Sequence, residues 1–358
     1  MSMKINFILS SLNDSHYLKR AQEFIDNGYE VKVYGFKRNN FDLTNLDFPV
    51  IELGNMESKN YFNRLPLLKK AIKKIAKENN EGLFFYSSLD IAMFARRYIK
   101  NPYIYEICDL TELVVPNSFI RKLLIRENKK CINNSLQTII TSEGFSEFYS
   151  SVNQDKFSLI PNKVAPTCLL PLNKENNFNK DEIHIGFVGV IRFSAIYNFI
   201  KVASKNKNIV IHLFGIYSAR DESSKKIEEL EKLSNNIIYH GAFKNPIDLP
   251  DVYKQLDMVL CTYPPTLGVI YAEPNKLYEA IYFRCPIIVS KNTFLGRKVE
   301  KLNIGYVIDA MNDSSIEKFI ESINLEDYNK KLQACYSIPQ KDCLNINDEF
   351  FTKLKSLC

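Results

Sequence analysis

The chain has 358 residues and a formal net charge of +6, and 46% of its residues are hydrophobic. This composition is that of a globular protein, and the length suits two domains. No apolar run reaches the roughly 18–20 residues that a membrane span needs, and the first residues lack the long apolar segment of a signal peptide. We therefore expect a cytoplasmic protein. The eight cysteines include no Cys-x-x-Cys pair and the four histidines are scattered, which predicts reduced thiols and no metal site.

Short runs of β-branched and aromatic residues alternate with helical patterns along the whole chain. The predicted strands of the first half cover residues 4–11, 30–36, 82–88, 103–108, 138–142 and 157–162. After a polar stretch at 172–182, predicted strands follow at 183–189, 209–215, 236–242, 258–263, 286–290 and 306–310. Such alternation predicts parallel sheets with right-handed crossovers. We expect an α/β protein with two Rossmann-like domains, residues 1–165 and 166–339.

Several common nucleotide and nucleic-acid signatures are missing from this sequence. Neither half has G-x-G-x-x-G after its first strand, so a dinucleotide-dependent oxidoreductase is disfavoured. There is no Walker sequence and no D-x-D segment for a metal-bridged diphosphate. The aromatic residues are spread through strands and no RNA- or DNA-binding motif is present, so we expect no nucleic-acid partner.

The segment "YAEPNKLYEAIYFRCPIIVS" at 271–290 carries the clearest chemical signal. Pro274 suits a helix start, where free backbone N–H groups and the helix dipole attract an anion. Lys276 adds a positive charge there, and Glu279 lies one turn on along the same helix face. A carboxylate repels phosphate but accepts hydrogen bonds from both hydroxyls of a ribose. The segment therefore predicts a site for a nucleoside diphosphate.

With these residues, the chain resembles GT-B glycosyltransferases, particularly the family-4-like enzymes that build bacterial surface polysaccharides. The resemblance covers nearly the whole sequence, in order and at similar spacing. Besides "EPNKLYEAIYFRCPIIVS", it includes the segments "NDSHYLKRAQEFIDNGYEVKVYGF" (13–36), "YEICDL" (105–110), "LIPNKV" (159–164) and "IGFVGVIRF" (185–193). The resemblance implies two Rossmann-like domains facing across a cleft, with a C-terminal helix at about 340–358 joining the first domain.

The same resemblance assigns residues to the donor. Glu279 is expected to hold the ribose, and Asn275 and Lys276 are expected at the diphosphate. Glu273 is expected to reach toward the donor sugar, and Phe243 to enclose the base. The donor implied is a nucleotide sugar, with UDP as the favoured nucleotide, and no separate cofactor or metal is implied.

Three further residues are implied in catalysis. Arg192 is expected to neutralise the leaving diphosphate, and Asp109, or failing that Glu106, to face the acceptor hydroxyl. The resemblance favours retention, whereas a general base at Asp109 implies inversion. Asp109 also suits a second role, as the N-cap of the helix that follows it. The acceptor implied is a saccharide or lipid-linked saccharide, in the synthesis of capsule, lipopolysaccharide or another surface glycan.

Two other functions remain compatible with these residues. One is a nucleotide-sugar epimerase of the same fold, which needs no acceptor. The other is a catalytically inactive nucleotide-sugar-binding subunit, because Glu273 and Glu279 stand closer together than the two glutamates that many family-4 enzymes carry. Incubation with donor alone distinguishes the epimerase, and binding without turnover distinguishes the inactive subunit.

Two basic segments of the first half predict contact with an anionic membrane surface. Residues 61–80 and 119–130 each combine several lysines or arginines with leucine and isoleucine at helical spacing. Such a helix can lie on the cytoplasmic face of a membrane, with each cation contributing roughly 1 kcal/mol. The alternative for each is a domain helix with its apolar face in the core. Peripheral association at the inner membrane is thus a hypothesis that depends on which face is exposed.

Overall fold

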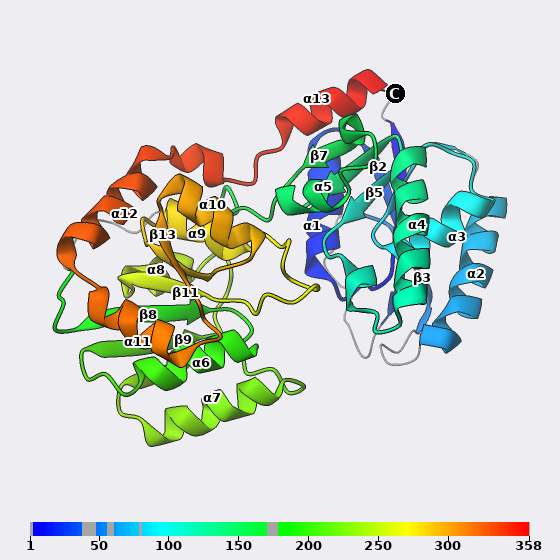
Figure 1. Ribbon diagram of the computed structural model, residues 1–358. Coiled ribbons are helices and arrows are strands. Elements are labelled where there is room, and N and C mark those ends of the chain that lie inside the picture. The colour runs from blue at the N-terminus through cyan, green and yellow to red at the C-terminus, as the bar shows by residue number, and fades with distance from the viewer. Residues whose placement is uncertain (1–2, 38–47, 56–60, 79–80, 170–177, 358) are drawn as a thin grey trace. The chain divides into compact units, whose positions relative to one another are not determined.

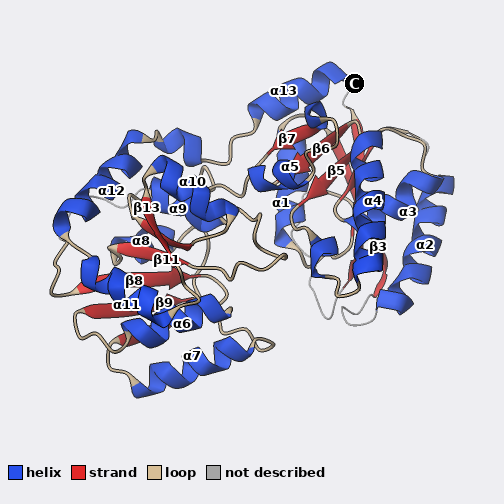
Figure 2. Ribbon diagram, viewed as in Figure 1, coloured by secondary structure: helices blue, strands red, loops and turns tan. Residues whose placement is uncertain are grey.

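The computed structural model describes residues 3–37, 48–55, 61–78, 81–169 and 178–357. They form two compact units: unit 1 comprises residues 1–160 and 347–358, and unit 2 comprises residues 161–346. Each unit is one parallel sheet with helices on its faces (Figures 1 and 2). The predicted α/β architecture with two Rossmann-like domains is confirmed. The first segment of unit 1 ends at Ile160, shortly before the boundary expected at residue 165.

The sheet of unit 1 has seven strands in the order β3-β2-β1-β4-β5-β6-β7. These strands are β1 (Lys4–Leu9), β2 (Glu30–Lys37), β3 (Val50–Asn55), β4 (Leu83–Tyr86), β5 (Tyr103–Ile107), β6 (Gln137–Ile140) and β7 (Phe157–Leu159). Only β3 was not predicted. It is an edge strand whose side chains are partly or fully exposed, so its sequence lacks the buried run of the central strands.

Helices cover both faces of this sheet. They are α1 (Ser15–Asp26), α2 (Tyr61–Glu78), α3 (Leu89–Tyr98), α4 (Ser118–Asn134), α5 (Glu143–Phe148) and α13 (Asp348–Leu357), with 3-10 turns η1 (Thr111–Val114) and η2 (Gln154–Lys156). Figure 1 shows α2, α3 and α4 side by side. The last helix, α13, belongs to unit 1 and packs on α1, where the rings of Phe24 and Phe351 are 5.0 Å apart. Two ends of the chain are therefore held by one aromatic cluster.

The sheet of unit 2 has six strands in the order β10-β9-β8-β11-β12-β13. These strands are β8 (Ile183–Val188), β9 (Ile209–Phe214), β10 (Ile237–Gly241), β11 (Met258–Cys261), β12 (Ile287–Ser290) and β13 (Gly305–Ile308). All of them fall on predicted strands, because each is a short apolar run whose residues are mostly buried between helices. The exposed middle of β10, at the edge of the sheet, is the exception.

The helices of unit 2 enclose two apolar clusters, one on each face of the sheet. They are α6 (Ser194–Ala203), α7 (Glu222–Leu233), α8 (Leu249–Lys254), α9 (Asn275–Tyr282), α10 (Phe294–Leu302), α11 (Asp313–Ser322) and α12 (Leu325–Ser337), with the 3-10 turn η3 (Gln340–Cys343). One cluster includes residues of α6, α7 and α11, and the other includes residues of α8, α9 and α10. Helix α9, which carries the predicted nucleotide motif, thus has a rigid apolar support.

The strand order of each sheet defines one switch point, where the direction of the connections between strands reverses. In unit 1 the connections from β1 and from β4 run in opposite directions along the sheet, and in unit 2 those from β8 and β11 do so. Loops that diverge in this way leave a crevice outside the carboxyl ends of the strands, where ligands of open α/β sheets bind. The residues after β1, β4, β8 and β11 are therefore the candidates for contact with a ligand.

Two further properties of the chain bear on the sequence expectations. The cysteines at 108, 131, 168, 261, 285, 335 and 343 are free thiols, while Cys358 lies outside the described residues. Within the part of the chain that the structure describes, no helix combines the length and hydropathy needed to cross a bilayer.

Candidate functional site

The start of α9 lies at the switch point of unit 2. Pro274 is the N-cap residue, with φ −78°, and no side chain of the described chain caps this end. Asn275 and Lys276 form the first turn. Because the first N–H groups of a helix have no intrahelical partner, this end favours an anion. The position predicted for the diphosphate is therefore the uncapped start of an eight-residue helix.

Lys276 connects α9 to the end of β8. Its Nζ lies 4.8 Å from the ring centre of Phe187. A Cβ atom added to Gly189 would stand 3.1 Å from the same Nζ, and Gly189 has φ +132°, which L side chains rarely adopt. A Cβ on the neighbouring Gly215 would meet the carbonyl oxygen of Gly189 at 1.8 Å. Glycine is required at both positions for this close approach.

Arg192 lies on the loop that leaves β8 and is exposed. Its guanidinium carbon is 4.6 Å from the ring centre of Phe193. Phe193 has φ +78°, an unfavourable conformation for a bulky residue, and its ring packs edge-on against Tyr263 at 5.2 Å. Tyr263 follows β11, so Phe193 joins the loops of the two strands that flank the switch point. Backbone strain of this kind often occurs at functional sites.

Glu279 is buried on α9, with 5% of its surface exposed. Its Oε2 accepts a hydrogen bond of 2.7 Å from the Tyr253 hydroxyl. Burial raises the pKa of Glu279, and the positive charge of Lys276 and the Tyr253 hydrogen bond offset part of that rise. Among the described residues, Oε1 receives no hydrogen bond, so the carboxylate retains capacity to bind a hydroxyl.

Glu273 is buried next to α9, and its Oε1 contacts two protein groups. Lys298 Nζ, from α10, donates to it at 2.6 Å, and the Tyr278 hydroxyl also donates to it. Sequence reasoning did not identify Lys298, because the pairing joins the loop before α9 to α10, with α9 and β12 between them in the sequence. The predicted contact between Glu273 and the donor sugar remains a prediction. Phe243 is half-buried and packs against the apolar cluster beneath α8 and α9.

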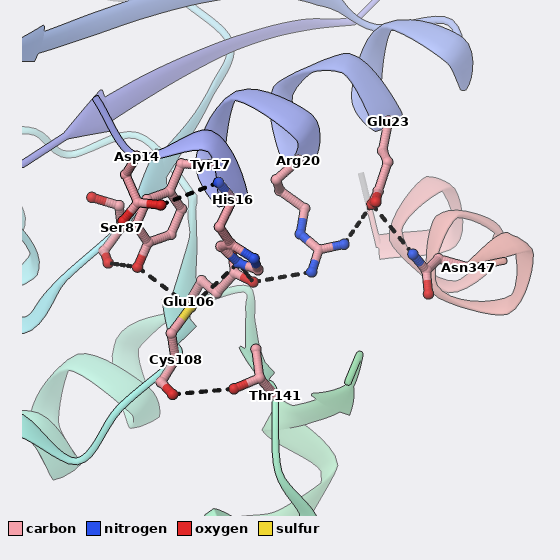
Figure 3. A network of polar contacts seen from close by, with 10 residues as sticks. All are labelled: Asp14, His16, Tyr17, Arg20, Glu23, Ser87, Glu106, Cys108, Thr141 and Asn347. Carbon is pink, nitrogen blue, oxygen red and sulfur yellow. Dashed lines mark hydrogen bonds and ion pairs between the residues drawn. The ribbon is translucent and has the colours of Figure 1, made fainter. Parts of the chain in front are cut away.

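The acceptor candidates of unit 1 differ strongly in their surroundings. Asp109 is exposed just after β5. The N-cap residue of the next turn, η1, is Leu110. The side chain of Glu106 is fully buried within β5 and forms an ion pair with Arg20 at 3.1 Å. Figure 3 shows that Glu106 points toward α1, to Arg20 and His16.

This polar cluster, here called the Glu106 cluster, consists of Glu106, His16, Arg20, Tyr17 and Cys108 (Figure 3). His16 Nε2 is 2.9 Å from Glu106 Oε1 and 3.3 Å from Cys108 Sγ. The pKa of Glu106 falls to about 2: burial would raise it, but the charges of Arg20 and His16 outweigh burial. Neither His16 nor Arg20 was predicted from the sequence, although their spacing of four places both on one face of a helix.

The donor atoms of His16, Glu106 and Cys108 lie within 4.8 Å of one another, a geometry that could hold a metal ion. The same carboxylate already contacts the buried cation of Arg20. Burial also raises the pKa of the Cys108 thiol, which keeps it protonated. Both facts oppose a divalent cation, and we assign no metal to this cluster.

Part of the chain matches a known protein family. Residues 171–337 match the family model described as glycosyl transferases group 1. No curated protein sequence gives a significant match.

Solved structures similar to the chain cover almost all of it. Sucrose-phosphate synthase from Thermosynechococcus elongatus is 14% identical with a TM-score of 0.75, covering 99% of this chain and 98% of that chain. HepE from Anabaena, in complex with UDP, is 16% identical with a TM-score of 0.70, covering 99% and 100%. WaaG, a glycosyltransferase involved in lipopolysaccharide biosynthesis, is 14% identical with a TM-score of 0.64, covering 95% and 97%. The fold and the family match together confirm the resemblance seen in the sequence. The chain has the GT-B fold, and its residues 171–337 match the model of the glycosyl transferases group 1 family.

Proposed function

We propose that this glycosyltransferase moves a sugar from a UDP-linked donor to a saccharide or lipid-linked saccharide, without a metal ion, in the synthesis of a surface glycan. The observation that carries the proposal is the convergence of Lys276 with the end of β8 at the uncapped start of α9. Arg192 lies on the loop that follows the same strand. Two cations and free N–H groups at one switch point suit the diphosphate of a nucleotide sugar.

The chemistry follows from the charge that develops during transfer. The bond between the anomeric carbon and the diphosphate oxygen breaks, the diphosphate leaves with negative charge, and the acceptor oxygen forms the new bond. In this proposal Lys276, Arg192 and the start of α9 stabilise that charge, and no metal ion takes part. We propose retention, with the leaving phosphate receiving the acceptor proton, and the anomeric configuration of the product measured by NMR tests this.

UDP is proposed as the nucleotide because HepE, similar in fold over its whole length, was solved with UDP and with UDP-glucose. Within this chain, Glu279 supports a ribose contact, since its Oε2 is fixed by Tyr253 while Oε1 receives no hydrogen bond from the described residues. One carboxylate oxygen can accept from both ribose hydroxyls.

Calorimetric titration with UDP, GDP and ADP in the presence of EDTA tests the nucleotide site. We expect UDP to bind, and Glu279→Ala to weaken UDP binding by roughly 10- to 100-fold, because a hydrogen bond to a charged group is lost. Glu279→Gln keeps an acceptor for Tyr253 and controls for packing. Glu300→Ala, at an exposed carboxylate of α10, is the matched control and should bind as the unmodified chain does. Binding that survives Glu279→Ala unchanged would remove the ribose role.

The structure separates the two basic segments that predict membrane contact. Helix α2 directs Leu68, Ile72 and Ile75 into unit 1, where they are buried. Among its described side chains, Leu67 is the large hydrophobic residue that is exposed, at 49%, beside the exposed lysines. Residues 79 and 80 of this segment lie outside the described chain. The 61–80 segment therefore fits a domain helix, and we do not propose it as a membrane contact.

The start of α4 has the opposite character. The apolar patch here consists of Val114 in η1 and of Phe119, Ile120 and Leu123 in α4, exposed to 63%, 76%, 45% and 49%. Cationic residues Arg121, Lys122 and Arg126 lie on the same stretch of helix. We propose that this patch contacts an anionic lipid surface, which places the enzyme peripherally at the cytoplasmic face of a membrane. The free thiols of the described cysteines support a reducing compartment.

Vesicle sedimentation tests this contact. We expect binding to phosphatidylcholine vesicles that contain phosphatidylglycerol, and weak binding to phosphatidylcholine alone, because the cations add attraction to the anionic surface. Phe119→Ser with Leu123→Ser should reduce binding at least about 10-fold, since each buried side chain contributes roughly 1.5–3 kcal/mol. Leu233→Ser, at a leucine of α7 exposed to 82%, is the control. Equal binding to both vesicle types contradicts the proposal.

A further inference from the structure

His16 occupies the switch point of unit 1. It lies in the first turn of α1, directly after the loop that leaves β1, and Asp14 caps this turn by accepting from the His16 backbone N–H at 3.1 Å. The adjacent Tyr17 donates its hydroxyl proton to the carbonyl oxygen of Ser87, which follows β4. The turn is thus tied to both strands that flank the crevice, where open α/β sheets bind their ligands.

The protonation of the imidazole follows from its partner. Glu106 is ionised, because its pKa is about 2, and an ionised carboxylate only accepts hydrogen bonds. His16 Nε2 must therefore carry the proton that is shared with Glu106 Oε1 at 2.9 Å. In the neutral imidazole the lone pair is on Nδ1. Nδ1 has no hydrogen-bond partner among the described residues, and 27% of the His16 side chain is exposed.

The groups behind Glu106 hold it in this position. Arg20 donates to Glu106 Oε1 at 3.1 Å and also pairs with Glu23 on the same helix. Glu23 Oε2 in turn accepts from Asn347, at the residue before α13, at 3.2 Å (Figure 3). A buried carboxylate that fixes the tautomer and orientation of a partly exposed histidine is a known way to present one ring nitrogen to a substrate.

We infer that His16 contacts the acceptor, with Nδ1 accepting a hydrogen bond from an acceptor hydroxyl, and that Glu106 is the positioning residue behind it. This inference rests on the proposed transferase function and changes the assignment of roles in unit 1. Glu106, fully buried, supports the contact instead of making it. The hydrogen bond orients the attacking oxygen of the acceptor. The bonds that form and break during transfer stay as proposed above.

The arrangement predicts a pH dependence. Burial lowers the pKa of His16, but the charge of Glu106 and its hydrogen bond outweigh burial, so the pKa is raised above 6.5. Asp14 also raises it and Arg20 lowers it, while Tyr17 and Cys108 stay neutral because burial raises their pKa values. Protonation converts Nδ1 from an acceptor to a donor. Acceptor use should therefore fall as the pH drops through this raised pKa.

Steady-state transfer from UDP-glucose to methyl glycosides of glucose, galactose and N-acetylglucosamine, between pH 5 and 9, tests the inference on the full chain. We expect His16→Gln to lower kcat/KM for the acceptor by about 10- to 100-fold, with UDP affinity unchanged. It should also abolish the acid limb, which is the fall of acceptor kcat/KM at low pH. His16→Asn places an amide oxygen near the Nδ1 position and should retain more activity than His16→Gln. Glu106→Gln should move the limb to lower pH. His184→Gln, at a partly exposed histidine of unit 2, is the control.

Two results overturn the inference. One is that the wild type transfers sugar and the His16→Gln variant shows the same acceptor kcat/KM and the same acid limb. The other comes from NMR of histidine-labelled protein, where the four histidines give a simple spectrum: a neutral His16 with its proton on Nδ1 would remove the hydrogen-bond acceptor. If the wild type binds UDP but transfers to no glycoside, the proposed acceptor class fails, and this NMR measurement still decides the His16 geometry.

Discussion

Replacing Lys276 with alanine is expected to lower kcat for sugar transfer by about 10²–10³, because the leaving diphosphate loses one preorganised cation. The position of Lys276 supports this expectation. Its Nζ lies over Phe187 and next to Gly189, at the end of β8, and Arg192 lies on the loop that follows this strand. Since negative charge builds up as the bond breaks, kcat should fall more than the affinity for the donor. Steady-state kinetics with UDP-glucose, at saturating and limiting donor, measure both quantities.

Two further variants make this test specific. Lys276→Gln keeps a hydrogen-bond donor without the charge and should fall between the wild type and alanine. Lys330→Ala, which removes an exposed lysine of unit 2 that pairs with Glu326, should leave kcat unchanged. If Lys276→Ala transferred sugar at the wild-type rate, the charge at the start of α9 would have no part in catalysis, and the proposed diphosphate site would have to be placed elsewhere.

Arg20→Met is expected to destabilise the protein by about 3–5 kcal/mol, because it leaves the buried carboxylate of Glu106 without its cation. Only 3% of the Arg20 side chain is exposed, and that of Glu106 is fully buried, so water does not replace the lost partner. Denaturation with urea at pH 7 measures the free energy of unfolding. The matched control is Arg97→Met: Arg97 has a half-exposed side chain beside Glu127, and its loss should cost less than about 1 kcal/mol.

The cause of this loss can be separated from a loss of packing. Adding Glu106→Leu to Arg20→Met removes the unpaired charge and should recover part of the stability. The pH dependence gives a second check. In the wild type the pKa of Glu106 is lowered from 4.5 to about 2, so its contribution is present above pH 4.5 and is lost as the pH falls toward 2. The difference between wild type and Arg20→Met should therefore shrink in acid, and a constant difference would argue for packing.

Much of the architecture could be predicted because it depends on short stretches of chain. Each central strand is a run of apolar residues buried on both faces, and such a run is visible without knowing its neighbours. The edge strand β3 was missed because its exposed residues carry no such run. The α9 motif was visible for the same local reason: Pro274, Lys276 and Glu279 acquire their relation from one helix turn and from nothing else.

Contacts between distant segments could not be predicted in this way. His16 and Glu106 are ninety residues apart in sequence, and only the pairing of β1, β4 and β5 brings them within a hydrogen bond. The pairing of Glu273 with Lys298 likewise depends on how α10 packs beside the loop that precedes α9. The two basic helices make the same point, since both have cations beside apolar residues, and packing alone decides that α2 buries its apolar face while α4 exposes Phe119.

The sequence by itself determined the α/β class, the strand positions in each sheet's interior and the helix start that suits a diphosphate. The physical reason is that periodic burial and helix capping act over a few residues. Only the tertiary structure decided that Glu106 supports a histidine, that Lys276 meets the end of β8, and that one of two similar helices keeps apolar side chains in water. Those features depend on which surfaces remain uncovered after the sheets and helices have packed, and packing is a property of the whole unit.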